Sequence, residues 1–286
     1  MVNKEKHVLG ISGGKDSAAL AVYMRQYHPE IDIEYFFTDT GKELPEVYDY
    51  LGKLEGLLGK PILYLNPERD FDFWLEKKFN YFLPSPQTRW CTRQLKLLPF
   101  EKWVKPMLDS GVKVYSYVAI RADEEFRNAY DSKHENLIIK LPFKEEGIDK
   151  EGVWELLEIS GLGRPAYYYN PIKKTGWRSR SGCTFCFYQQ KIEWVGLLEN
   201  YPKFFEEAKK YEKTALEHNS PFTWSQGESL EELSAPKRVE EIKKEHAERL
   251  ERLKARRPEN PLRPSAEPID MDDLYGQSKV CIACHK

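Results

Sequence analysis

The feature that most constrains the fold of this chain is a glycine-rich turn near its N-terminus, at residues 12–17. The turn reads SGGKDS; it follows a short apolar run at residues 8–11 and precedes an Ala-, Leu- and Met-rich segment at residues 18–24. This order predicts a strand, a tight turn and a helix whose N-terminal amides bind an anion. Gly13 and Gly14 lack a Cβ atom, so the backbone can approach phosphate oxygens closely.

The letters of this turn exclude two commoner phosphate-binding loops. A Walker loop requires a glycine where this chain has Leu9 and a serine or threonine where it has Asp16. A dinucleotide fingerprint requires G-x-G-x-x-G, which the turn does not contain. The hydroxyls of Ser12 and Ser17 and the positive charge of Lys15 are then the candidate phosphate ligands. The alternative is a turn that joins strand to helix and binds nothing.

The charge composition gives no reason to expect a nucleic-acid or membrane surface. Charged residues make up 31% of the chain, yet its net charge is only −2, which leaves local basic patches open. No apolar run reaches the roughly 20 residues of a membrane span, and the first residues, MVNKEKH, lack a signal-peptide core. We therefore expect a cytoplasmic protein with no membrane partner. In that reducing compartment, five cysteines indicate metal or redox chemistry before disulfides.

Segments with strand character alternate with helical segments along the first half of the chain. After the first helix, the expected elements are strands at residues 31–38, 61–65 and 112–120 and a helix at residues 43–58. This alternation predicts an α/β fold with a mostly parallel sheet and helices on both faces. Residues 12–17, 39–41 and 121–124 each follow an expected strand. Because ligands bind beyond the carboxyl ends of such strands, we expect these three loops to meet and form the site.

The second half of the chain is predicted to be mainly helical. The expected elements are a short helix at residues 149–159, a loop at residues 161–171, and helical regions at residues 192–217 and 236–257. Residues 258–268 carry four prolines and are expected to be extended. We divide the chain into a nucleotide-binding domain at residues 1–195 and a helical C-terminal region at residues 196–286, with a Pro-rich tail that ends in C-x-x-C.

All five cysteines lie in settings that indicate metal binding. Cys91 lies in RWCTRQLK, and the others form two C-x-x-C pairs, Cys183 with Cys186 and Cys281 with Cys284. Such a pair places two thiolates close enough to share one metal. One hypothesis is a [4Fe-4S] cluster on Cys91, Cys183, Cys186 and one tail cysteine. A second hypothesis is a tetrahedral Zn²⁺ site on the two pairs, and a third is that the cysteines are reduced and structural. The last residues, CIACH, also match the c-type haem attachment pattern, but that pattern does not suit a chain without an export signal.

Taken in order, several motifs resemble those of phosphoadenosine-phosphosulfate (PAPS) reductase-like proteins of the ATP pyrophosphatase superfamily. They are SGGKDS, TDTGKE, WCTRQLK followed by Pro99, AIRADE and GCTFC, and together they span about residues 8–194. The resemblance implies an adenine-nucleotide α-hydrolase-like, Rossmann-like fold with phosphates bound at residues 12–17. It also implies that the nucleotide lies near Asp39, Thr40, Glu43 and Arg121.

The family that the chain resembles includes sulfonucleotide reductases and iron–sulfur members that use ATP, such as the sulfur-transfer component of DNA phosphorothioation systems. Trp90-Cys91 stands where cluster-containing reductases have tandem cysteines, and Cys284-His285 lacks the Glu and Gly of the reductase tail. The intact SGGKDS turn is also similar to that of members that hydrolyse ATP. We therefore interpret the chain as an ATP-dependent sulfurtransferase with an iron–sulfur cluster. A PAPS-type reductase with Cys284 as nucleophile and a nucleotide-sensing scaffold subunit are the alternatives.

This interpretation leads to a hypothesis for the mechanism. ATP binds at residues 12–17, and an acceptor oxygen attacks its α-phosphorus while Lys15 stabilises the leaving pyrophosphate. Asp16 is the candidate Mg²⁺ ligand; Asp123 and Glu124 either bind Mg²⁺ or cap the next helix. Sulfur carried on the cluster, or as a persulfide held near Cys91, then replaces the activated oxygen.

The acceptor is the least constrained part of this hypothesis. DNA or tRNA is the candidate acceptor, and a cysteine desulfurase or another sulfur donor is the candidate partner. Arg178, Arg180 and Trp177 lie just before Cys183 and could hold a nucleic-acid backbone and stack a base. The alternative is that these arginines bind the phosphates of the nucleotide or surface carboxylates.

Overall fold

A five-stranded sheet forms the centre of the molecule in this computed structural model, which describes residues 5–125, 127, 129, 134–170, 175–220 and 222–256. The strands run in the order β3-β2-β1-β4-β5, and every neighbouring pair is parallel. They are β1 (Glu5–Gly10), β2 (Ile33–Phe37), β3 (Ile62–Tyr64), β4 (Lys113–Tyr117) and β5 (Leu137–Lys140). The predicted parallel α/β sheet is confirmed, and β5 is a strand that the sequence reasoning missed.

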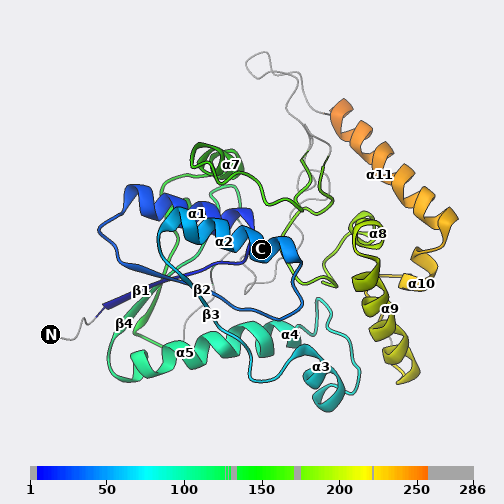
Figure 1. The fold of residues 1–286 in the computed structure, drawn as a ribbon, viewed down its shortest axis with the longest axis horizontal. Helices are drawn as coiled ribbons and strands as arrows, with labels where there is room; N and C mark the ends of the chain where they lie inside the picture. The colour runs from blue at the N-terminus through cyan, green and yellow to red at the C-terminus, as the bar shows by residue number, and fades with distance from the viewer. Residues whose placement is uncertain are drawn as a thin grey trace.

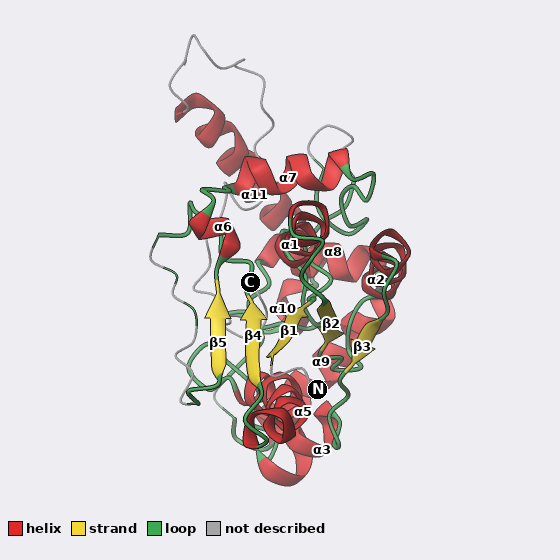
Figure 2. Cartoon of the chain, turned by 90° about the vertical axis from the view of Figure 1, so that its left-hand side faces the viewer, coloured by secondary structure: helices red, strands yellow, loops and turns green. Residues whose placement is uncertain are grey.

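Helices cover both faces of this sheet (Figures 1 and 2). One face carries α1 (Lys15–Tyr27), α2 (Pro45–Leu58) and α7 (Lys150–Ile159), and the other carries α5 (Leu98–Asp109). Short helical pieces extend the α5 side: α3 (Phe71–Phe73), the π-helix η1 (Trp74–Lys78), α4 (Trp90–Thr92) and the π-helix η2 (Arg93–Leu97). α2 ends at Gly59, whose φ of 66° is left-handed and therefore favours glycine.

The remaining helices lie beside the sheet layer, at the right of Figure 1. They are α8 (Lys191–Asn200), α9 (Pro202–Glu217), α10 (Leu230–Leu233) and α11 (Pro236–Arg256), while the short α6 (Pro142–Glu145) follows β5. The helical region predicted at residues 192–217 is two helices rather than one. They are separated at Tyr201, because Pro202 has no N–H to continue the first helix and suits the first turn of a new one.

Buried apolar side chains connect the sheet layer with the helical region. The larger cluster includes Leu9 of β1 together with Trp194, Phe205 and Trp224, all at most 3% exposed. Val8 belongs to a second cluster on the α5 side, because neighbouring residues of a strand point to opposite faces. The larger cluster crosses the domain boundary that we place at residue 195, and that boundary stays a prediction. Among the helices of the described residues, none is long and apolar enough to cross a bilayer.

The strand order places a topological switch point beside β1. From β1 the chain proceeds to β2 and β3 on one side, and later places β4 and β5 on the other. The loops after β1 and β4 therefore leave the sheet in different directions, which opens a crevice at the carboxyl ends of these strands. The glycine turn follows β1 and Arg121 lies just beyond β4, so both lie at the position where such sheets bind ligands.

Candidate functional site

The glycine turn after β1 forms a corner lined with hydroxyl groups. The N–H of Ser12 donates to Ser17 Oγ at 3.0 Å, and the two hydroxyl oxygens are also 3.0 Å apart. Gly13 has a φ of 72°, and a Cβ atom there would lie 2.6 Å from Val47 Cγ1, so only glycine fits. Gly14 is the N-cap of α1 and has no side chain to cap the first amides. This local geometry suits an anion at the start of α1.

Lys15 and Asp16 belong to a buried ion network that joins the loops after β1 and β4. Lys15 Nζ lies 3.1 Å from Asp16 Oδ2, and Arg121 Nη1 donates to Asp16 Oδ1 at 2.9 Å. Arg121 also donates to both carboxylate oxygens of Asp123, at 2.8 and 3.0 Å. Burial lowers the pKa of Arg121, but the carboxylates of Asp16 and Asp123 outweigh it, so this pKa is raised. The expectation that these two loops meet is confirmed.

The carboxylates of this network do not fit the role of Mg²⁺ ligands. Both oxygens of Asp16 and both oxygens of Asp123 accept from cationic side chains. Glu124 accepts from Arg127 at 3.1 Å and from the N–H of Arg121 at 3.1 Å. At Asp16 and Glu124 a metal ion would have to displace buried pairs, at a high electrostatic cost, and at Asp123, which is 36% exposed, it would have to displace both guanidinium contacts of Arg121. We therefore assign none of these three carboxylates to Mg²⁺.

The loop after β2 contacts the cysteine segment. Thr40 Oγ1 donates to Glu43 Oε1 at 3.0 Å and lies 3.4 Å from Cys183 Sγ. Cys183 Sγ in turn lies 3.7 Å from Glu43 Oε1. Burial and the Glu43 carboxylate raise the pKa of the Cys183 thiol well above its usual range. The carboxylate of Asp39 forms a hydrogen bond within its own loop, where it accepts from the N–H of Gly41 at 2.8 Å.

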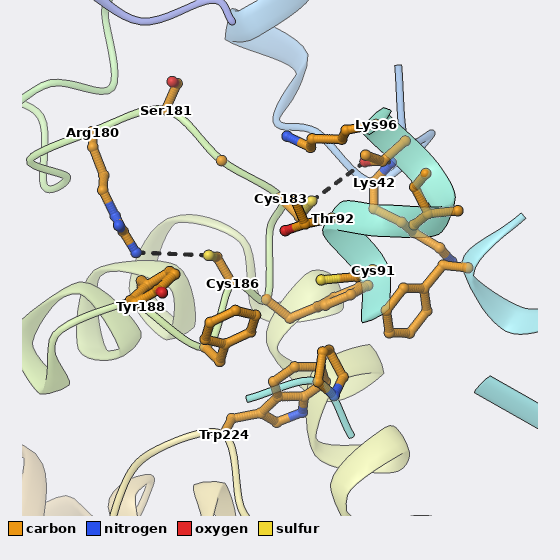
Figure 3. A pocket seen from close by; sticks show the side chains of 17 residues that line it. Lys42, Cys91, Thr92, Lys96, Arg180, Ser181, Cys183, Cys186, Tyr188 and Trp224 are labelled. Atoms are coloured by element: carbon orange, nitrogen blue, oxygen red, sulfur yellow. Dashed lines mark hydrogen bonds between the residues drawn. The ribbon is translucent and has the colours of Figure 1, made fainter. Parts of the chain in front are cut away.

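Cys91, Cys183 and Cys186 line one pocket, and Figure 3 shows their sulfur atoms facing the same space. Cys91 comes from α4, at the start of a helical stretch whose next turn is the π-helix η2; such turns are frequent at functional sites. The other two come from the loop before α8. Apolar and cationic side chains complete the walls, among them Phe71, Leu95, Phe185, Trp224, Lys42, Lys96 and Arg180.

The donor set of this pocket fits a thiolate-bound metal group. Three cysteines are the typical ligands of zinc or an iron–sulfur cluster, and nearby cations offset thiolate charge: Arg180 Nη2 lies 3.7 Å from Cys186 Sγ. As placed, no three Cys, His, Asp or Glu side chains of the described residues form a group that could hold a metal ion. Cys281 and Cys284, one of which the cluster hypothesis needs and both of which the zinc hypothesis needs, lie outside the described residues.

Arg178 and Trp177 have structural contacts rather than the ligand-binding role that we considered for them. Arg178 is 2% exposed, and its guanidinium donates to the carbonyls of Gly182 and Cys183 at 2.8 and 2.7 Å. Trp177 packs on α8, where a Cβ atom at Gly196 would lie 2.7 Å from Trp177 Cε3. These contacts shape the cysteine loop and leave Arg178 unable to reach a nucleic-acid backbone.

Replacing Arg178 with methionine is expected to destabilise the cysteine loop. Each buried carbonyl that loses its donor costs roughly 1–3 kcal/mol, so the free energy of unfolding and the metal content of the purified protein should both fall. Urea unfolding and metal analysis would measure the two effects. Arg93→Met is the matched control, because Arg93 is about half exposed and pairs with the exposed Glu101; equal losses in both variants would contradict the structural role of Arg178.

Three hydroxyl groups from the second half of the chain reach the glycine turn, and the sequence reasoning missed them. Tyr167 OH donates to the carbonyl of Gly13 at 2.6 Å. Tyr168 OH accepts from the N–H of Lys15 at 3.4 Å, and Ser181 Oγ donates to Ser12 Oγ at 3.4 Å. The sequence feature that could have indicated the two tyrosines is the run of three tyrosines at residues 167–169, which no motif explained.

Comparison with known proteins shows what the N-terminal part of the chain is similar to. Residues 6–136 match the model described as the phosphoadenosine phosphosulfate reductase domain, which confirms the resemblance that the motifs indicated. A curated relative is an uncharacterized protein of Methanocaldococcus jannaschii, 29% identical over 227 residues. The match covers 78% of this chain and 44% of that relative, so the chain spans less than half of the relative's length.

Two solved structures are similar to this chain at low sequence identity. The phosphoadenylyl-sulfate (PAPS) reductase of Candida auris in its phosphate complex has a TM-score of 0.46 and 14% identity, covering 62% of this chain and 81% of that chain. The U34-tRNA thiolase NcsA of Methanococcus maripaludis with its [4Fe-4S] cluster has a TM-score of 0.39 and 16% identity, covering 83% and 82%. At such TM-scores, neither structure identifies a substrate or cofactor for this chain.

Proposed function

We propose that this chain is an ATP-dependent sulfurtransferase, because its residues 6–136 match the model of the phosphoadenosine phosphosulfate reductase domain. It cleaves ATP between the α and β phosphates, adenylylates an acceptor oxygen, and allows sulfur to replace that oxygen. One observation carries the proposal: residues 178–186 contact both the glycine turn and the cysteine pocket. Ser181 Oγ lies 3.4 Å from Ser12 Oγ, and Cys183 and Cys186 line the pocket. Nucleotide activation and sulfur chemistry would then occupy adjoining parts of one site.

In the proposed reaction, the glycine turn binds the β and γ phosphates of ATP. The first amides of α1 and the hydroxyls of Ser12 and Ser17 donate to phosphate oxygens, and the dipole of α1 favours the charge of the leaving pyrophosphate. Lys15 and Arg121 share the Asp16 carboxylate, and Arg121 also pairs with Asp123, so much of their positive charge is offset. Their role is to position the turn and the β4 loop, while amides and hydroxyls provide most of the binding. Such a reaction depends on positioning and electrostatics.

The cysteines provide the other half of the proposed site. Cys91, Cys183 and Cys186, with one tail cysteine, would hold a [4Fe-4S] cluster, and Zn²⁺ on the two C-x-x-C pairs is the alternative. When bound, the cluster would supply sulfur chemistry beside the nucleotide. The presence of Cys91 in the same pocket as the Cys183 pair supports the cluster over the zinc site. Burial and the Glu43 carboxylate raise the pKa of the Cys183 thiol, and the positive charge of Lys96 partly offsets this effect.

We propose a nucleic acid, DNA or tRNA, as the acceptor, and a cysteine desulfurase or another sulfur donor as the partner. The supporting contacts lie at Tyr188, which lines the cysteine pocket. The Arg180 guanidinium lies 4.7 Å from the centre of the Tyr188 ring, and Arg89 Nη1 donates to Tyr188 OH at 3.4 Å. A base can stack on an aromatic ring while arginines attract its phosphates.

The experiment that tests this function measures AMP and pyrophosphate released from ATP by anaerobically purified protein, with and without DNA or tRNA. We expect pyrophosphate release that depends on the acceptor. Tight ATP binding with no cleavage would instead favour the nucleotide-sensing scaffold, and release of inorganic phosphate with ADP would contradict cleavage between the α and β phosphates. Cys284→Ser should leave ATP cleavage intact; if that variant instead loses turnover of PAPS, the reductase alternative is correct.

A further inference from the structure

We propose that Tyr168 and Ser181 bind phosphate, closing the glycine turn from a part of the chain that lies beyond residues 6–136. This inference rests on the proposed ATP site and extends it with two ligands that the family motifs do not contain. The two residues lie on either side of Arg178 in the sequence, and both side chains approach Gly14.

Hydroxyl groups pack closely around Gly14. A Cβ atom built on Gly14 would lie 2.7 Å from Ser181 Oγ and 3.2 Å from both Ser12 Oγ and Tyr168 OH. Ser17 Oγ adjoins this ring, at 3.0 Å from Ser12 Oγ. The nearest neighbours of Gly14 on this side are therefore polar oxygens rather than apolar atoms. Each hydroxyl can turn its hydrogen toward a phosphate oxygen.

The contacts that these two hydroxyls make within the turn are long. The N–H of Lys15 to Tyr168 OH and Ser181 Oγ to Ser12 Oγ both measure 3.4 Å, beyond the usual range of strong hydrogen bonds. A phosphate oxygen offers charge-assisted bonds, which are shorter and roughly twice as strong. A phosphate at the start of α1 would therefore take over the N–H of Lys15 and receive the hydroxyl hydrogens of Tyr168 and Ser181.

The backbone that presents Tyr168 and Ser181 is held firmly in place. Tyr167 is 1% exposed, and its hydroxyl donates to the carbonyl of Gly13 at 2.6 Å. The N–H of Tyr169 donates to the carbonyl of Arg178 at 2.9 Å, and the N–H of Arg178 donates to the carbonyl of Tyr167 at 3.0 Å. Both hydroxyls are thus oriented before a ligand arrives, which reduces the entropy lost on binding.

The test compares ATP affinity in the full-length wild type, Tyr168→Phe and Ser181→Ala, measured by isothermal titration calorimetry with a non-hydrolysable ATP analogue. Each variant is expected to bind the analogue about tenfold or more weakly, as for loss of a hydrogen bond to a charged group, and to bind adenosine as the wild type does. Tyr115→Phe and Ser160→Ala are the matched controls. Their hydroxyls donate to the carboxylate of Glu5, at the start of β1, and to the carbonyl of Leu157, away from the turn, so analogue affinity should not change.

The outcomes separate this inference from the proposed function. If wild type binds the analogue and both variants bind it equally well, the inference is wrong and the proposed ATP site stands. Tighter binding by Tyr168→Phe would mean that the hydroxyl obstructs the site, which also overturns the inference. If wild type fails to bind the analogue, both proposals are wrong. Thermal unfolding without ligand shows whether each variant is folded, and an equal loss of adenosine and analogue binding would indicate a structural role only.

Discussion

Replacing Asp16 with asparagine is expected to lower the free energy of unfolding by about 3–5 kcal/mol, the usual effect of breaking a buried ion pair. The carboxylate of Asp16 contacts Lys15 Nζ at 3.1 Å and Arg121 Nη1 at 2.9 Å, and all three side chains are at most 2% exposed. An amide is isosteric but neutral, so two buried cations lose the anion that both contact. Equilibrium unfolding in urea measures the effect.

Glu101→Gln is the matched control for Asp16→Asn. It makes the same chemical change in the pair between Arg93 and Glu101, whose side chains are 52% and 48% exposed. Exposed pairs contribute about 0–1 kcal/mol, so the control should unfold nearly like the wild type. Similar losses in the two variants would show that the network between the β1 and β4 loops does not stabilise the fold.

Cys91→Ser is expected to lose most of the iron of anaerobically purified protein, from about four atoms per chain, as in a [4Fe-4S] cluster, to less than about one. The reason is that Cys91 shares the pocket with Cys183 and Cys186. Without the Cys91 thiolate, only two of these three cysteines remain to bind the cluster. Iron, zinc and sulfide analyses, together with the visible absorbance of the cluster, measure the loss.

The zinc hypothesis predicts the opposite result for the same variant. If the two C-x-x-C pairs hold Zn²⁺, Cys91→Ser keeps a full complement of zinc. Cys183→Ser should lose the metal under both hypotheses and so serves as the positive control. A wild-type preparation that is colourless and contains zinc alone would remove the cluster from the proposal, while the ATP site could still be tested separately.

Short-range patterns in the sequence predicted most of the secondary structure that forms the sheet layer. The SGGKDS turn, the helix after it and three of the four later strands follow from apolar spacing and glycine content, which act over a few residues. The missed strand, β5, has only four residues, LIIK, and a run this short does not distinguish strand from helix. The division at Tyr201 was missed because the aromatic pattern continues on both sides of Pro202.

The chemistry of the site depended on contacts that no local pattern encodes. Asp16 and Arg121 are 105 residues apart and Ser12 and Ser181 are 169 apart, so only the strand order and the packing of the second half bring them together. The neighbours of each charged side chain in the folded chain then decided its role. Of two arginines that are close in the sequence, Arg178 donates to backbone carbonyls, whereas Arg180 lines the cysteine pocket. The residue types were therefore visible in the chain, whereas their partners were set by tertiary packing, because electrostatic and hydrogen-bond energies depend on distance in space and on exclusion of water.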